Sequence, residues 1–234
     1  MDALQVEGVA ERLDYVRKGI EITKKEINNK LPLIGFAGAP WTIFSYMIEG
    51  SGSKTFSKAK RMLYTQTELS HKLLDKITEA TIQYLKMQIK SGADIVQVFD
   101  SWAGILDKEM YATFAIPYIQ KICNAIEEVP VIVFAKGAYF AIDDLNNLNC
   151  QVLGMDWSLS VEEMKTKINN TKTLQGNLDP CVLYADKSEI KKHTLNMLNR
   201  FKGHRHIANL GHGVYPDTNW EHVKYYIDLI KENS

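Results

Sequence analysis

Arginine and cysteine are scarce in this 234-residue chain, and each scarcity narrows the possible functions. Only five arginines occur, and 28 basic side chains balance 28 acidic ones to a formal net charge of zero. Nucleic-acid-binding proteins usually carry a basic excess, so we expect no nucleic-acid partner. The three cysteines form no C-x-x-C pair and no even disulfide set, which favours a reducing, cytoplasmic compartment.

Long apolar runs and signal sequences are missing as well. No stretch of about 18 apolar residues occurs, so we expect no membrane span. The charged residues 1–19 contain no apolar signal core. Hydrophobic residues still make up 45% of the chain, which is enough for a packed core. No interdomain linker is visible, and we expect one domain over residues 1–234.

Short β-branched runs alternate with longer stretches of helical spacing. We predict strands over residues 31–36, 94–99, 129–134, 151–156, 171–176 and 206–210. We predict helices over residues 6–29, 67–91, 108–127, 161–169, 188–201 and 219–232. This alternation is typical of β/α units with parallel strands. Two α/β architectures fit: a doubly wound sheet, or a (β/α)8 barrel with about six of its eight units present.

Ligands bind beyond the carboxyl ends of the strands in both architectures, so the loops after the strands are informative. Gly38 permits a tight bend, and Pro40 suits the first turn of a short helix that would carry Tyr46. Tyr46 either contacts a ligand or is half-buried with its hydroxyl bound to the backbone. Ser101 either binds a ligand or caps the next helix. No G-x-S-x-G motif surrounds Ser101, which argues against a serine nucleophile.

Histidine and lysine complete the candidates after the strands. His212 stands between two glycines, which would leave the imidazole open to a ligand, and a functional role is favoured. His204 and His206 lie at the entry end of their strand, so we expect a structural role and no metal. Lys136 can form a Schiff base, contact an anion or simply reach solvent.

Five segments together resemble the uroporphyrinogen decarboxylase family of haem biosynthesis. They are PLIGFAGAPWT (32–42), YMIEG (46–50), VFAKG (133–137), LQGNLDP (174–180) and IANLGHGVYP (207–216). The resemblance runs in order from about residue 2 to the end of the chain. It implies a (β/α)8 TIM barrel, a cytoplasmic homodimer, and no metal or organic cofactor. It also implies decarboxylation of the four acetate side chains of uroporphyrinogen III to give coproporphyrinogen III.

The resemblance also assigns roles to particular residues. It implies that Tyr46 lies near the family's central ligand-binding aspartate. It implies that Ser101 and His212 contact carboxylates of the substrate. Phe36 and Phe99 match aromatic residues that form the wall of the family's pocket. Tyr46, Ser101 and His212 are therefore the predicted substrate-binding residues.

The chain departs from the family at its front. The family's N-terminal segment holds an arginine-rich stretch and the central aspartate, and neither has a counterpart here. We therefore expect an N-terminally truncated barrel that contains no catalytic residue of its own and is inactive or nearly so. Charge-assisted donors are needed for a substrate with eight carboxylates, and no arginine follows a predicted strand. The acidic residues after the strands, Asp100, Asp156 and Asp179, do not match the central aspartate.

Two other functions remain open. A non-catalytic barrel remnant or interaction module would keep the surface of the barrel without the missing units. A relative of the cobalamin-dependent methyltransferases would carry zinc on His and Cys, but residues 133–137 contain no His-x-Cys. The strands at 31–36 and 206–210 would be open edges, which predicts self-association.

Overall fold

Parallel strands alternate with helices through residues 3–233, the part of the chain that the computed structural model describes. The chain divides into two compact units, residues 3–151 and 152–233. Among the described residues, no helix is both long and apolar enough to cross a membrane. The expectation of one domain over 1–234 stays a prediction.

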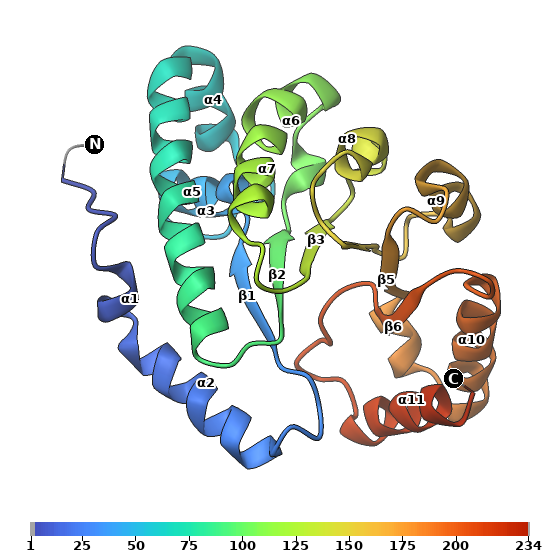
Figure 1. Cartoon of the computed structure of the whole chain (residues 1–234). Coiled ribbons are helices and arrows are strands. Elements are labelled where there is room, and N and C mark those ends of the chain that lie inside the picture. Colours follow the sequence, from blue (N-terminus) through green and yellow to red (C-terminus); the bar gives the residue numbers. More distant parts are fainter. Residues whose placement is uncertain (1–2, 234) are drawn as a thin grey trace. The chain divides into compact units, whose positions relative to one another are not determined.

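Three strands form the sheet of the first unit (Figure 1): β1 (Ile34–Gly38), β2 (Ile95–Asp100) and β3 (Val131–Ala135). β2 lies in the middle and pairs in parallel with both neighbours. Every residue of β3 is buried, so its unbroken apolar sequence needs no alternation. In β2, Val96, Val98 and Asp100 are fully buried on one face, while on the other face Gln97 is buried and Phe99 is partly exposed.

These strands begin and end later than predicted. β2 ends at Asp100, one residue beyond the prediction, and β1 ends two residues beyond it. In a strand, successive side chains point to opposite faces. Asp100 is therefore the last member of the buried row of β2 and not the first residue of a loop.

Helices and short 3-10 turns complete the first unit. They are α1 (Val9–Arg12), α2 (Asp14–Ile27), α3 (Pro40–Glu49), α4 (Ser57–Thr65), α5 (Thr67–Lys90), η1 (Ala103–Ile105), α6 (Lys108–Phe114), α7 (Ile116–Ala125), η2 (Tyr139–Ala141) and α8 (Ile142–Asn146). The long helix α5 packs against β1, α3 and α7. The helix predicted over 108–127 is two helices, because Pro117 lacks the amide hydrogen that a continuous helix would use.

The second unit repeats the pattern with β4 (Val152–Gly154), β5 (Thr173–Leu178) and β6 (His206–Leu210). β5 pairs in parallel with both of its neighbours. The helical segments are α9 (Val161–Ile168), η3 (Pro180–Tyr184), α10 (Lys187–Arg200) and α11 (Trp220–Glu232). Side chains of Ser160, Asp186 and Asn219 accept hydrogen bonds from the first turns of the three α-helices.

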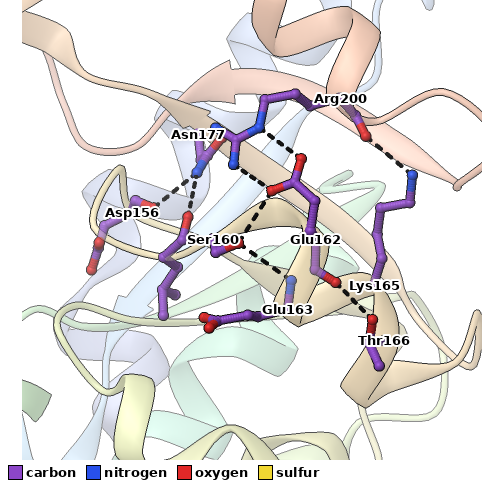
Figure 2. A network of polar contacts seen from close by, with 9 residues as sticks. Asp156, Ser160, Glu162, Glu163, Lys165, Thr166, Asn177 and Arg200 are labelled. Carbon is purple, nitrogen blue, oxygen red and sulfur yellow. Dashed lines mark hydrogen bonds and ion pairs between the residues drawn. The ribbon is translucent and has the colours of Figure 1, made fainter.

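Polar contacts join the elements of the second unit (Figure 2). Arg200 of α10 donates from Nε and Nη2 to the two carboxylate oxygens of Glu162 on α9, at 2.9 and 2.6 Å. This pair lowers the pKa of Glu162 to about 2. The Asn177 amide of β5 donates to the carbonyls of Asp156 and Leu159, each at 3.2 Å. The loop after β4 is thereby held against β5, and α9 is held against α10.

The predicted α/β class with six parallel strands is confirmed in the described residues. Each strand except the last is followed by helical segments that lead to the next strand. This is the β/α repeat of a barrel with six units present.

Candidate functional site

The segment after β1 places Tyr46 as predicted. Ala39 is extended (φ −68°, ψ 154°), as expected before proline, and Pro40 opens α3. Tyr46 lies in the second turn of α3 and is 42% exposed. Gly50 ends the helix at φ +80°, a conformation that glycine adopts without strain. The sequence therefore presents a partly exposed phenol at the carboxyl end of the strand.

Aromatic side chains hold the Tyr46 ring from two sides. Its centroid lies 6.0 Å from that of Phe56 and 6.2 Å from that of Trp102, both edge to face. Phe56 is fully buried, and its ring centroid lies 4.7 Å from that of Trp102. Such contacts restrict the ring without involving its hydroxyl group. Trp102 directly follows Ser101, so the Tyr46 ring packs against the turn that carries Ser101.

Ser101 is half-buried in the turn after β2. The alternative that Ser101 caps the next helix is wrong. η1 begins after Trp102 without a side-chain cap, and α6 is capped by Asp107, which accepts from the Met110 amide at 2.9 Å. The hydroxyl of Ser101 is therefore not used as a helix cap.

Asp100, the neighbour of Ser101, is completely buried. Its Oδ1 accepts a hydrogen bond from Thr42 Oγ1 of α3 at 2.7 Å. Burial raises the pKa of the carboxyl to about 6, although the contacts with Thr42 and Tyr111 oppose the shift. Burial, together with the Asp100 charge, raises the pKa of Tyr111 well above its ordinary value. The Tyr111 hydroxyl is close enough to influence Asp100, but its geometry does not complete a hydrogen bond.

The predicted pocket-wall residues form a row across the first sheet. Phe36 of β1 is 61% exposed and meets Phe99 of β2 edge to face, with centroids 5.8 Å apart. Phe99 meets Phe134 of β3 at the same separation. Phe36 and Phe99 therefore lie on one face of the sheet, which is the arrangement that a shared apolar wall requires.

His212 lies in the second unit, directly after β6, and is exposed. The sequence predicts that both neighbouring glycines leave the imidazole open, but the structure shows this for only one of them. Gly211 is buried, and a Cβ there would stand 2.7 Å from the Trp157 amide nitrogen and 3.1 Å from Asp156 backbone atoms. Gly213 is exposed, with nothing within 4 Å of such a Cβ. Gly211 thus permits close packing against the protein's own backbone, and only Gly213 leaves open space.

The other acidic residues after the strands of the second unit have structural partners. Asp156 is buried and accepts hydrogen bonds from the Ser158 amide, at 2.8 Å, and from the Ser158 hydroxyl. Asp179 caps η3 by accepting from the Cys181 amide at 2.9 Å. Neither carboxylate is presented for proton transfer.

The histidines predicted to be structural are structural. His204 binds the Lys172 carbonyl at 3.1 Å, and His206 binds the Gly176 carbonyl at 2.6 Å. His206 also stacks on Phe201, with centroids 3.7 Å apart. Burial lowers the pKa of both histidines. In residues 3–233, no cluster of His, Cys, Asp and Glu has the arrangement of a metal site.

Arginine is absent from the strand exits, as the sequence indicates. Arg17 and Arg200 form ion pairs with acidic residues of helices, and Arg12 and Arg205 donate to backbone carbonyls. Arg61 lies exposed on α4. Within residues 3–233, the arginines therefore lie on helices or, for Arg205, directly before β6, and none of them directly follows a strand.

Comparison with protein families identifies the chain's relatives. The family model described as "Uroporphyrinogen decarboxylase (URO-D)" matches residues 1–233. Proteins named uroporphyrinogen decarboxylase from Chloroherpeton thalassium, Ovis aries and Homo sapiens are 43%, 44% and 43% identical to this chain. The matches cover 100%, 97% and 97% of this chain and 69%, 64% and 65% of those proteins. The chain thus spans about two thirds of the length of these relatives.

Solved structures share the fold at lower identity. A methyltransferase from Methanosarcina mazei superposes with a TM-score of 0.83 at 22% identity, over 95% of this chain and 65% of that one. A B12-independent methionine synthase from Shewanella superposes with a TM-score of 0.66 at 10% identity, over 93% and 67%. These likenesses agree with the predicted barrel type of α/β fold.

Proposed function

The chain belongs to the uroporphyrinogen decarboxylase family, and from that membership we propose that it takes part in converting uroporphyrinogen III to coproporphyrinogen III. The observation that carries the proposal is the family match over residues 1–233, with relatives of that name at 43–44% identity. In the proposed reaction each of four acetate side chains loses its carboxylate as CO2. The electrons of the broken carbon–carbon bond flow into a pyrrole that has been protonated on a ring carbon. A second proton then completes the methyl group, and the ring carbon releases the proton that it took up, so that each cycle consumes one proton and restores the pyrrole.

The substrate contacts are proposed to come from three polar side chains and one apolar wall. Tyr46 and Ser101 flank Trp102 in the first unit, and both are at least partly accessible. His212 is exposed after the last strand of the second unit. Hydroxyl and imidazole groups suit substrate carboxylates because they donate hydrogen bonds to them. Phe36 and Phe99 supply an aromatic surface on which a tetrapyrrole can lie.

The proton-handling groups are proposed to lie outside this chain. The reaction needs a carboxylate to stabilise the pyrrole cation and an acid to deliver the proton. Asp100 and Asp156 are buried, and Asp179 caps a helix. The arginines of the described residues are likewise absent from the strand exits. We infer that the 234-residue chain binds a tetrapyrrole weakly and does not turn it over at the rate of a complete enzyme.

Two measurements on the 234-residue chain test this proposal. The first is fluorescence titration with uroporphyrin, the oxidised form of the substrate, for the native chain, His212→Ala and His193→Ala. We expect His212→Ala to weaken binding by about tenfold, which is the effect of losing one charge-assisted hydrogen bond. His193 is an exposed histidine of α10 paired with Glu189, and its substitution should have no effect.

The second measurement is the release of coproporphyrinogen from uroporphyrinogen. Turnover at a normal enzyme's rate would contradict the inferred inactivity of the chain alone. No uroporphyrin binding by any variant would instead favour the interaction module over the decarboxylase pocket.

The cellular setting is part of the same proposal. None of the three cysteines forms a disulfide in the described residues, and two of them, Cys123 and Cys150, are buried. Free thiols are typical of proteins in a reducing compartment, which supports a cytoplasmic location. A homodimer is proposed as the assembly, and no metal or organic cofactor is proposed for the reaction.

A further inference from the structure

The buried carboxyl group of Asp100 has no role in the proposed reaction. Removing a carboxyl group from water is costly unless its hydrogen bonds are satisfied. Oδ1 accepts from Thr42, but Oδ2 has no hydrogen-bond partner among the described residues. An apolar side chain at the end of β2 would fill the same space without the cost of removing a carboxyl group from water. The position of Asp100, beside Ser101, indicates a different purpose.

Hydrogen bonds connect both neighbours of Ser101 to the first turn of α3. Asp100 binds Thr42 Oγ1 at 2.7 Å, and the same oxygen accepts from the Trp102 amide at 3.4 Å. The indole nitrogen of Trp41 donates to the Trp102 carbonyl at 3.0 Å. The turn that carries Ser101 is therefore attached to α3 on both sides of the serine.

The same turn is also attached to the loop after β3. The Lys136 amide donates to the Asp100 carbonyl at 3.0 Å, and the Gly104 amide donates to the Lys136 carbonyl at 2.9 Å. A Cβ at Gly104 would lie 3.1 Å from the Gly137 carbonyl oxygen, so the two loops are in close contact. With β2 and β3 fixing the turn, Thr42 and Trp41 are the two points at which α3 is attached to it, and Thr42 is the one that Asp100 binds.

We propose that Asp100 is a positioning residue, whose carboxyl holds α3 through Thr42 against the Ser101 turn and so sets the separation of the Tyr46 and Ser101 hydroxyls. Tyr46 lies one helical turn beyond Thr42, and its ring packs on Trp102. Asp100 itself touches no ligand. The connection between Asp100, Thr42 and the turn is argued from the structure alone. Its effect on substrate binding rests on the proposed function.

Amide hydrogen exchange tests the linkage without a ligand. In Asp100→Ala and in Thr42→Val we expect the Trp102 amide to exchange about tenfold faster, because the attachment of the turn to α3 through Thr42 is weakened or lost. Asp100→Asn keeps an acceptor for Thr42 and should retain the native protection. Thr78→Val is the matched control: Thr78 is a buried threonine of α5 that bonds only within its own helix, to the Leu74 carbonyl. Native protection at Trp102 in both Asp100→Ala and Thr42→Val would overturn the inference.

A double-mutant cycle with uroporphyrin binding tests the positioning of Tyr46. We expect Asp100→Ala and Tyr46→Phe each to weaken binding by about tenfold, and the double variant to be no weaker than either. A residue that only stabilises the fold would give additive losses, and additivity would overturn the inference. If the native chain does not bind uroporphyrin, the proposed function fails, and the exchange experiment still decides the role of Asp100.

Discussion

Titration of Asp100 should make the stability of the fold depend on pH in an unusual direction. Burial raises the pKa of this carboxyl from its ordinary 3.8 to about 6, so the native state holds the proton more tightly than the unfolded chain. The contribution of Asp100 to the free energy of unfolding is fully present below about pH 4, and it is lost as the pH rises toward 6 and beyond. Asp100→Asn removes this loss and keeps an acceptor for Thr42.

We therefore expect Asp100→Asn to be more stable than the native chain by about 1–3 kcal/mol at pH 7, and by little or nothing near pH 4. Urea unfolding of both proteins at a series of pH values between these limits measures the difference. A difference that does not change with pH would show that Asp100 titrates normally in the folded state.

Gly211 and Gly213 flank His212 but should differ in their tolerance of a side chain. A Cβ at Gly211 would stand 2.7 Å from the Trp157 amide nitrogen, and the backbone there cannot easily move away to relieve the contact. We expect Gly211→Ala to lower the free energy of unfolding by about 1–3 kcal/mol, as overpacking of a close contact does. Gly213→Ala, which meets nothing within 4 Å, should change it by less than about 0.5 kcal/mol. Equal losses in denaturant unfolding would contradict this distinction.

At the level of elements, the open edge of β1 is covered by one side chain of α5. The Gln88 carboxamide accepts from the Phe36 amide and donates to the Phe36 carbonyl, both at 2.9 Å. A Cβ at Gly35 would lie 2.6 Å from Gln88 Oε1, so glycine is what allows this approach. The amide of Gln88 thus takes the place of a neighbouring strand at Phe36.

We expect Gln88→Leu to lower the free energy of unfolding by about 2 kcal/mol, because both hydrogen bonds to Phe36 lose their partner. Gln83→Leu on the same helix is the control. Gln83 bonds only Glu79, one turn away, and should cost less than about 0.5 kcal/mol. The two variants are compared by urea unfolding under the same conditions, and similar values would show that the edge contact adds nothing.

The elements that the sequence predicts well are those whose signal is local. α5 begins at Thr67 as expected, and α3 begins at Pro40, because proline and the period of apolar residues act within a few positions. β6 occupies the predicted residues, 206–210. The apolar period over 108–127 predicts one helix, whereas the structure has two, because Pro117 opens a new helix inside an otherwise continuous helical pattern.

The parts of the candidate site that the sequence does not predict depend on distant partners. Tyr46 and Ser101 could be placed after their strands, but Phe56 and Trp102, which pack against the Tyr46 ring, carry no motif. The burial of Asp100 follows from β2 being one residue longer than expected, because the strand alternation then carries Asp100 to the same face as Val96 and Val98. Gln88 and Phe36 are 52 residues apart in sequence, and nothing local indicates their contact.

At the scale of the whole molecule, the net charge and the positions of the arginines limit how this chain can bind an anionic substrate. The chain has 28 basic and 28 acidic side chains, and the paired arginines serve helix surfaces. A substrate with eight carboxylates would therefore find aromatic surface, hydroxyls and an imidazole, but no arginine directly after a strand of the described residues. This is why the proposed function assigns recognition to this chain and assigns proton transfer elsewhere.

The exposed apolar surface beside β1 is expected to drive self-association of the chain. Ile34 is 41% exposed at the start of β1. A cavity of about 390 Å³ opens beside the same strand, and residues of α1, α3 and α5 contribute to its lining. Exposed apolar strand edges promote association, and a charged side chain on the edge opposes it.

We expect the chain to elute above its monomer mass of 26.6 kDa in size-exclusion chromatography with light scattering. Ile34→Lys should shift the mass toward the monomer, because association through β1 would bury the introduced charge. Tyr64→Lys introduces the same charge at a more exposed apolar residue, on α4 and 62% accessible, and should leave the native mass unchanged. A stable monomer for the native chain at all concentrations would contradict self-association. An equal effect of both lysines would place the contact elsewhere than at β1.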